Sequence, residues 1–168
     1  MYRRHFMVSA AAGLAVSGCT SSSKFKTYNG PEITGIVVNK DAREMFLVHN
    51  GRALKKYEID LGFAPVGDKQ IEGDGKTPEG TYIIDRRNPN SDFHLSLGIS
   101  YPNANDVAEA RALGKSPGGD IFIHGKSSPF RKNNRDADWT WGCIAVTNGE
   151  MEDIYAMVRN GTPITINP

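Results

Sequence analysis

Short alternating segments separated by turn residues constrain the fold of this 168-residue chain most strongly. Asn50 and Gly51 both tolerate positive φ and form a hairpin signal, after which residues 56–61 alternate polar and apolar side chains. Two short segments rich in apolar residues, 34–39 and 43–49, precede this turn. Eighteen glycines and nine prolines supply further turns. The pattern predicts a mainly β fold with short helices that begins with three antiparallel strands.

The rest of the chain alternates short strands with two helices. Strands are predicted at residues 81–84, 121–124, 143–146 and 163–166. Asn105 is expected to cap a helix that ends near Leu113, because Gly114 follows. Thr147 and Glu150 form a capping box in front of a second helix with one apolar stripe. The stripe consists of Met151, Ile154, Tyr155 and Val158. Without an internal repeat, one domain over residues 31–168 is predicted.

The N-terminus has the pattern of an export signal. Arg3 and Arg4 precede an apolar stretch, residues 6–16, that is too short to span a bilayer. The following Val16-Ser17-Gly18-Cys19 resembles the lipobox of bacterial lipoproteins, in which the cysteine is acylated; a plain secretory signal is the alternative. Residues 1–18 are thus expected to be a signal peptide and residues 19–30 a tether. This predicts an exported protein of the cell envelope or periplasm, held on the membrane, the outer one in a Gram-negative cell, by a lipid on Cys19.

Charge and cysteine content narrow the function. Twenty basic residues against 19 acidic ones give no field that favours nucleic acid as a partner. Cys19 cannot pair with Cys143 once it is acylated or cleaved off, so Cys143 is a lone thiol in an oxidising compartment. Such a thiol is either a buried structural residue or a nucleophile. The sequence offers no histidine and cysteine spacing typical of a metal site, and no cofactor is expected.

A base for this thiol lies nineteen positions upstream. A cysteine attacks as its thiolate and therefore needs a base or a field that lowers its pKa. His124 ends one predicted strand and Cys143 begins another, so the two meet if these strands are neighbours. Gly125 permits close approach beside the histidine, and Gly142 allows a sharp turn that aims backbone N–H groups at an oxyanion.

The order of these motifs resembles the L,D-transpeptidase catalytic domain. Ile123-His124-Gly125 and Thr140-Trp141-Gly142-Cys143 are similar to its catalytic signature, and residues 73–82, GDGKTPEGTY, to its upstream motif. The resemblance covers about residues 33–166 and implies a β-sandwich or barrel-like sheet. It implies Cys143 as nucleophile, His124 as base and the Gly125 carbonyl as orienter of the imidazole. The implied substrates are peptidoglycan stem peptides, cleaved through an acyl-enzyme thioester between stem residues three and four.

Two departures from that signature leave the reaction's outcome open. Trp141 stands where the family commonly has a histidine, and Ala145 where a polar residue is common. Transfer to a second stem would make the protein an L,D-transpeptidase. Transfer to water would make it an L,D-carboxypeptidase or amidase-like hydrolase, and a non-catalytic peptidoglycan-binding lipoprotein is the further alternative.

Several residues are candidates for contacts with the stem peptide. Trp139 and Trp141 shortly precede the thiol and are either core residues or walls of the pocket; at least one of them is expected to line the site and exclude water. Arg131 and Arg135 lie in the preceding polar loop, where they either meet stem carboxylates or belong to a solvated loop. His94 is either a third member of the site or a structural hydrogen-bonding residue.

Overall fold

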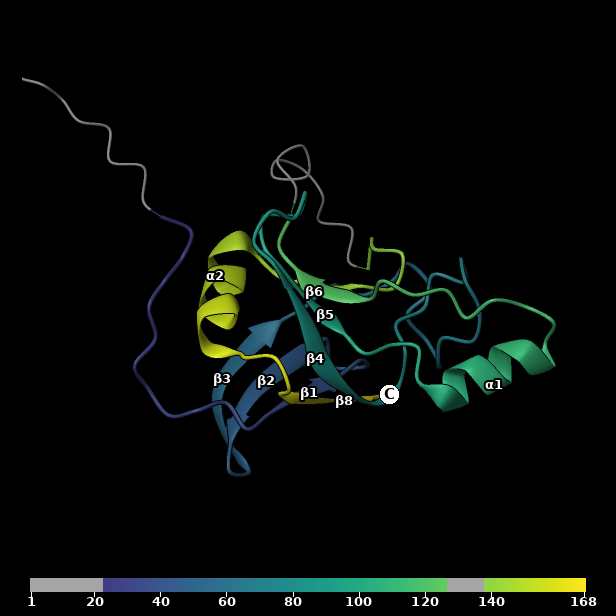
Figure 1. Ribbon diagram of the computed structural model, residues 1–168, viewed down its shortest axis with the longest axis horizontal. Coiled ribbons are helices and arrows are strands. Elements are labelled where there is room, and N and C mark those ends of the chain that lie inside the picture. The colour runs from purple at the N-terminus through teal and green to yellow at the C-terminus, as the bar shows by residue number, and fades with distance from the viewer. Residues whose placement is uncertain (1–22, 127–137) are drawn as a thin grey trace, which may run out of the picture.

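One curled sheet with two helices forms the body of the protein (Figure 1). The structure, a computed structural model, describes residues 23–126 and 138–168. Its eight strands run in the order β3-β2-β1-β8-β4-β5-β6-β7. The elements are β1 (Gly35–Asn39), β2 (Glu44–His49), β3 (Arg52–Glu58), β4 (Gly80–Asn88), β5 (Ser96–Ile99), α1 (Ala104–Ala112), β6 (Phe122–His124), β7 (Ile144–Ala145), α2 (Asn148–Met157) and β8 (Pro163–Asn167).

The first three strands form the predicted antiparallel meander. In β1 and β2, alternate residues are buried, and Val38 faces Met45 across the register. Tyr57, Ile59 and Leu61, the apolar set of the alternating segment, are all buried. The alternation therefore assigns the inner face of this part of the sheet correctly, because successive side chains of a strand point to opposite faces.

Two strands depart from the sequence expectation. β8 pairs in parallel with β1, with Ile36 opposite Ile164, and so connects the first strands to β4. β5 was not predicted, because Ser96–Ile99 is short, contains Gly98 and is buried at all four residues. A strand buried on both faces has no alternation to reveal it.

The sheet curls until its two ends meet. Asp60, just past β3, exchanges backbone hydrogen bonds of 2.9 and 2.8 Å with Ala145 of β7, the strand at the other end of the sheet. Phe63 N–H also donates to the Thr140 carbonyl at 2.9 Å, and Thr140 N–H donates to Leu61. We refer to the contact of residues 60–63 with residues 140–145 as the seam. The barrel-like sheet with short helices that the sequence predicted is thus confirmed.

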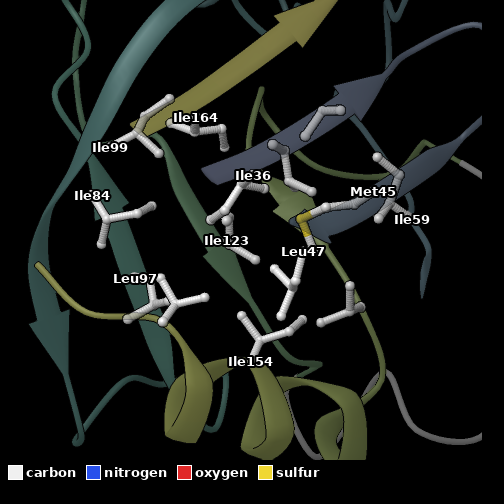
Figure 2. Close-up of a cluster of buried hydrophobic side chains, with 14 of the residues drawn as sticks. Ile36, Met45, Leu47, Ile59, Ile84, Leu97, Ile99, Ile123, Ile154 and Ile164 are labelled. Carbon is white, nitrogen blue, oxygen red and sulfur yellow. The ribbon is translucent and has the colours of Figure 1, made fainter. Parts of the chain in front are cut away.

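The core fills the concave side of this sheet. Buried side chains from both halves of the sheet converge, and α2 covers them with Ile154 and its neighbours (Figure 2). α2 begins at the predicted capping box, since Thr147 and Glu150 cap each other. The labelled core residues of Figure 2 are Ile36, Met45, Leu47, Ile59, Ile84, Leu97, Ile99, Ile123, Ile154 and Ile164.

The cap of α1 differs from the expectation. The helix begins at Ala104, and Asn103 is its N-cap, accepting hydrogen bonds from the backbone of Asn105 and Asp106. In return, the Asp106 carboxylate accepts a hydrogen bond from the Asn103 N–H at 2.7 Å. Asn105 therefore lies within the first turn, because a reciprocal box favours the cap two residues earlier. No helix within residues 23–126 and 138–168 is long and apolar enough to cross a membrane.

Part of the segment assigned to a tether contacts the domain. Lys24 Nζ donates to the carbonyls of Pro89 at 2.6 Å and His94 at 3.2 Å. Lys26 Nζ lies 2.7 Å from an Asp153 carboxylate oxygen, on α2. These contacts place residues 24–26 along the outer side of α2, where Figure 1 shows the chain running past that helix.

Candidate active site

The predicted base and nucleophile lie on neighbouring strands. β6 pairs in parallel with β7, with Ile123 opposite Ile144 and His124 opposite Ala145. Cys143 is two residues before Ala145, so alternation places it on the same face as His124, one diagonal step away. The pairing that the sequence analysis required is therefore present in the structure.

The imidazole of His124 is held in one tautomer. Its Nδ1 lies 2.6 Å from the Gly125 carbonyl oxygen, which can only accept, so Nδ1 carries the proton and Nε2 is the basic nitrogen. The ring is 4% exposed, and burial lowers the pKa of His124 below its ordinary value, an effect that the Gly125 hydrogen bond partly opposes. The rings of Phe93 and Trp139 lie 4.6 and 5.8 Å from it. At neutral pH the site thus contains a neutral, oriented base.

The thiol of Cys143 is also neutral at rest. Burial raises its pKa; the Phe122 N–H, 3.4 Å from Sγ, lowers it, Asp120 raises it further, and Lys69 has a smaller lowering effect. Sγ also lies 3.5 Å from the Asp120 carbonyl oxygen, to which it donates. No field therefore creates a thiolate in advance, and the proton has to leave when the sulfur attacks.

The turn in front of Cys143 requires glycine. Gly142 has φ of 122°, and a Cβ on it would lie 2.6 Å from the backbone carbonyl oxygen of Lys76. Its N–H donates to Thr140 Oγ1 at 3.1 Å, and that hydroxyl donates to the Cys143 carbonyl at 2.7 Å. The Gly142 N–H is thus engaged within the turn, and the expectation that this turn aims backbone N–H groups at an oxyanion stays a prediction.

The GDGKTPEG segment supports this turn from behind. The Asp74 carboxylate accepts hydrogen bonds from three backbone N–H groups and pairs with the buried Lys69 at 2.9 Å. Burial alone would raise the pKa of Asp74, but Lys69 and these N–H groups together lower it. This closed loop brings Gly75 against Gly62. A Cβ on Gly62 would lie only 2.0 Å from the Gly75 carbonyl oxygen. The sequence motif therefore has a packing role beside the thiol.

One cavity contains both reactive groups. Its volume is about 550 Å³. Trp141 lies at its edge, 73% exposed, with its ring 5.1 Å from that of Phe63 in an edge-to-face contact. The lining residues are Asn88, Ser91, Asp92, Phe93, Ser96, Asp120, Phe122, His124, Trp139, Thr140, Trp141 and Cys143. Trp139 and Trp141 thus both border the space beside the thiol.

Of the other predicted site residues, His94 lies within the described part of the chain and is engaged elsewhere. His94 is not part of its lining; its Nε2 lies 2.9 Å from the Glu152 carboxylate on α2. That geometry favours the structural alternative for His94. Arg131, Arg135 and Cys19 lie outside the described residues.

Sequence reasoning missed three residues around His124. Phe93, next to the residue that was singled out, packs against the imidazole. Asn148 Oδ1 accepts from the Lys126 N–H at 2.7 Å and leaves no space for a side chain at Gly125. Asp60 accepts from the Trp139 indole at 3.1 Å across 79 positions of sequence. The contacts of Asn148 and Asp60 depend on how the sheet curls, so no local sequence pattern reveals them.

Comparison with known proteins identifies the family. The profile of the YkuD family, the L,D-transpeptidase catalytic domain, matches residues 33–166. The chain belongs to this L,D-transpeptidase family. "Putative L,D-transpeptidase YafK" of Escherichia coli K12 is 33% identical over 107 residues, which are 62% of this chain and 37% of that protein.

Solved structures of other proteins share the fold. The helical cell shape determining protein Pgp2 from Campylobacter jejuni matches with a TM-score of 0.62 at 27% identity, over 83% of this chain and 49% of that chain. Bd1075 from Bdellovibrio bacteriovorus matches in fold with a TM-score of 0.57 at 23% identity, over 80% and 48% of the two chains. This chain thus spans about half the length of these structures and little more than a third of YafK.

Proposed function

We propose that this protein is an exported cysteine enzyme that acts on peptidoglycan stem peptides through an acyl-enzyme thioester. Membership of the L,D-transpeptidase catalytic-domain family supports a peptidoglycan-acting enzyme. The observation that carries the finer proposal is the placement of His124 and Cys143 on adjacent strands in one cavity. A neutral imidazole with a free Nε2 beside a neutral thiol is the resting state that general-base catalysis requires.

The reaction follows from these two groups. Cys143 Sγ attacks the carbonyl carbon of stem residue three while Nε2 of His124 takes the thiol proton, so the S–C bond forms as the sulfur loses its hydrogen. The tetrahedral intermediate collapses, the amide C–N bond breaks, and His124 returns the proton to the leaving amine of residue four. An amine or a water molecule then attacks the thioester and releases Cys143.

The choice of acceptor depends on the cavity's edge. Trp141 is exposed there and can neither accept a proton nor pair with a carboxylate, so it supplies an apolar surface where the family commonly has a histidine. Transfer to a second stem amine is the leading outcome, and hydrolysis by water is the alternative. A non-catalytic wall-binding lipoprotein predicts neither product.

We further propose that the protein works in the cell envelope. The N-terminal sequence supports a signal peptide over residues 1–18 and a lipid on Cys19, with the membrane as a partner through that anchor. A substrate in the peptidoglycan layer is consistent with this place.

Product analysis tests the proposed function. The protein without residues 1–18 is incubated with purified muropeptides, and products and intact protein are followed by mass. We expect a transient acyl adduct on Cys143, followed by joined stems for transfer or loss of one terminal residue for hydrolysis. Absence of both an adduct and any product, with binding to sacculi retained, would favour the non-catalytic alternative and contradict the proposal.

The pH profile tests the role of His124. The imidazole acts as a base only when neutral, and burial lowers its pKa below the ordinary 6.5, so it stays neutral to lower pH than a free histidine. We therefore expect kcat/KM to be constant around pH 7 and to fall only below pH 6.5, as His124 becomes protonated. His49→Gln, at an exposed hairpin end, should leave this profile unchanged. An acidic limb centred above 6.5 would show that another group governs it.

A further inference from the structure

Asp60 lies in the seam and makes contacts that the proposed chemistry does not use. One carboxylate oxygen, Oδ2, accepts from the Trp139 indole N–H at 3.1 Å and lies 2.9 Å from Nζ of Lys126. The side chain is 23% exposed, so these interactions are partly shielded from water. A single atom thereby holds two residues that are both adjacent to the base.

The first of these residues forms a wall of the imidazole. The Trp139 ring stands edge-to-face against His124, at 5.8 Å and 70°, and lies 6.0 Å from Phe93. Phe93 in turn lies 4.6 Å from His124, so the imidazole packs against two aromatic rings that also contact each other. A hydrogen bond to the indole N–H restricts the rotation of Trp139 and thus the position of this wall.

The second residue follows the imidazole's orienting carbonyl. Lys126 comes directly after Gly125, whose oxygen accepts from His124 Nδ1. Its backbone N–H is already held by Asn148 at 2.7 Å, and Asp60 holds its side chain. The peptide that fixes the tautomer of His124 is therefore anchored on both sides.

We propose that Asp60 is a positioning residue for His124, because one carboxylate oxygen holds the Trp139 wall and the Lys126 anchor together. The proposal deepens the proposed function and rests on it for its kinetic consequence. Its effect on the reactivity of Cys143 is independent of any substrate. The Trp139 ring and the Gly125 carbonyl orient the imidazole of His124, and Asp60 holds Trp139 and Lys126, the residue after Gly125, in place.

Substitution of the Asp60 side chain leaves the backbone hydrogen bonds of this residue intact. Its N–H and carbonyl exchange hydrogen bonds with Ala145 at 2.9 and 2.8 Å, and these bonds do not involve the carboxylate. Asp60→Ala thus removes the two interactions and leaves the seam's backbone pairing. Asp60→Asn keeps an acceptor for the indole and loses only the negative charge that pairs with Lys126.

The rate at which iodoacetamide alkylates Cys143, measured from pH 5 to 10, reports the reactivity of the thiol and the assistance by His124 without a peptide substrate. We expect Asp60→Ala to lower the rate at pH 7 about tenfold and Asp60→Asn by no more than about threefold, since small displacements of a catalytic group have large effects. The rise of the rate with pH should shift upward in Asp60→Ala, because burial raises the pKa of an unassisted Cys143 thiol. A merely structural role would not move this profile.

A double-mutant cycle tests whether Asp60 acts through the indole. Trp139→Phe keeps an aromatic ring but cannot donate, so in that background Asp60→Ala should slow alkylation by less than about threefold. Glu44→Gln, which removes the Glu44–Lys56 pair on β2 and β3, is the control and should alkylate like the wild type. Thermal melting of every variant identifies loss of fold.

Opposite results overturn the inference. Equal alkylation in Asp60→Ala and the wild type contradicts it, and so does an Asp60→Asn variant as slow as Asp60→Ala, because the acceptor atom would then not matter. With muropeptides, we expect kcat to fall in Asp60→Ala and KM to change less than about twofold. A wild type that turns over no stem peptide counts against the proposed function alone, since the alkylation series still decides the role of Asp60.

Discussion

The Cys143→Ala variant is expected to lose at least about a thousandfold in turnover of peptidoglycan stems, because without the sulfur no thioester forms. The change removes one buried sulfur and leaves the Thr140 hydroxyl to hold the Cys143 backbone carbonyl at 2.7 Å. The melting temperature should therefore change by only a few degrees. Initial rates with purified muropeptides and a thermal melt measure the two effects.

A serine variant sharpens this prediction. Cys143→Ser replaces the thiol by a hydroxyl, a group with a much higher pKa, so the same imidazole deprotonates it poorly. We expect turnover to remain at least about a hundredfold below the wild type. Turnover within threefold of the wild type in Cys143→Ala would contradict the assignment of the nucleophile.

Gly142→Ala is expected to damage both stability and activity. A side chain at φ of 122° is strained, and its Cβ would lie 2.6 Å from the Lys76 carbonyl oxygen, which belongs to a loop closed by Asp74 and Lys69. Because backbone on both sides would have to shift, we expect a loss of roughly 2–4 kcal/mol in the free energy of unfolding. This corresponds to about 5–10 °C in melting temperature for a domain of this size.

The same substitution should slow catalysis, because the turn carries the thiol. A displacement of Cys143 by a fraction of an ångström relative to His124 is expected to lower kcat about a hundredfold. Gly149→Ala is the matched control, since a Cβ there meets nothing within 4 Å and alanine favours the helix α2. Equal melting temperatures for the two variants would show that the turn does not need glycine.

The fold was predictable where local patterns were complete. The alternation over residues 56–61 predicted one apolar face, the Asn50-Gly51 signal predicted the turn between β2 and β3, and the Thr147–Glu150 box predicted the start of α2. Local patterns did not predict the strand Ser96–Ile99, which is buried on both faces. They also predicted Asn105 as the cap of α1, whereas the structure has Asn103 there. Each failure concerns a choice that depends on burial or on a reciprocal bond.

The reactive pair was also predictable, since motif order and spacing assigned Cys143 and His124 before their strands were known to be neighbours. Its surroundings were not. The same patterns singled out His94, yet the cavity is lined by Phe93, while His94 pairs with Glu152. Phe93 and His94 lie in a turn in which His94 has φ of 75°, and no local sequence pattern tells which of the two side chains faces the cavity.

The sequence by itself determined the strand-rich class and the start of α2, because these depend on neighbours a few positions apart, and motif order and spacing nominated His124 and Cys143 as the reactive pair. Only the tertiary structure decided the parallel pairing of β1 with β8, the engaged Gly142 N–H, and the contact of Asp60 with Trp139. Those contacts arise when burial of the core curls the sheet until its ends meet at the seam. That closure brings together residues whose separation in the chain leaves no local pattern.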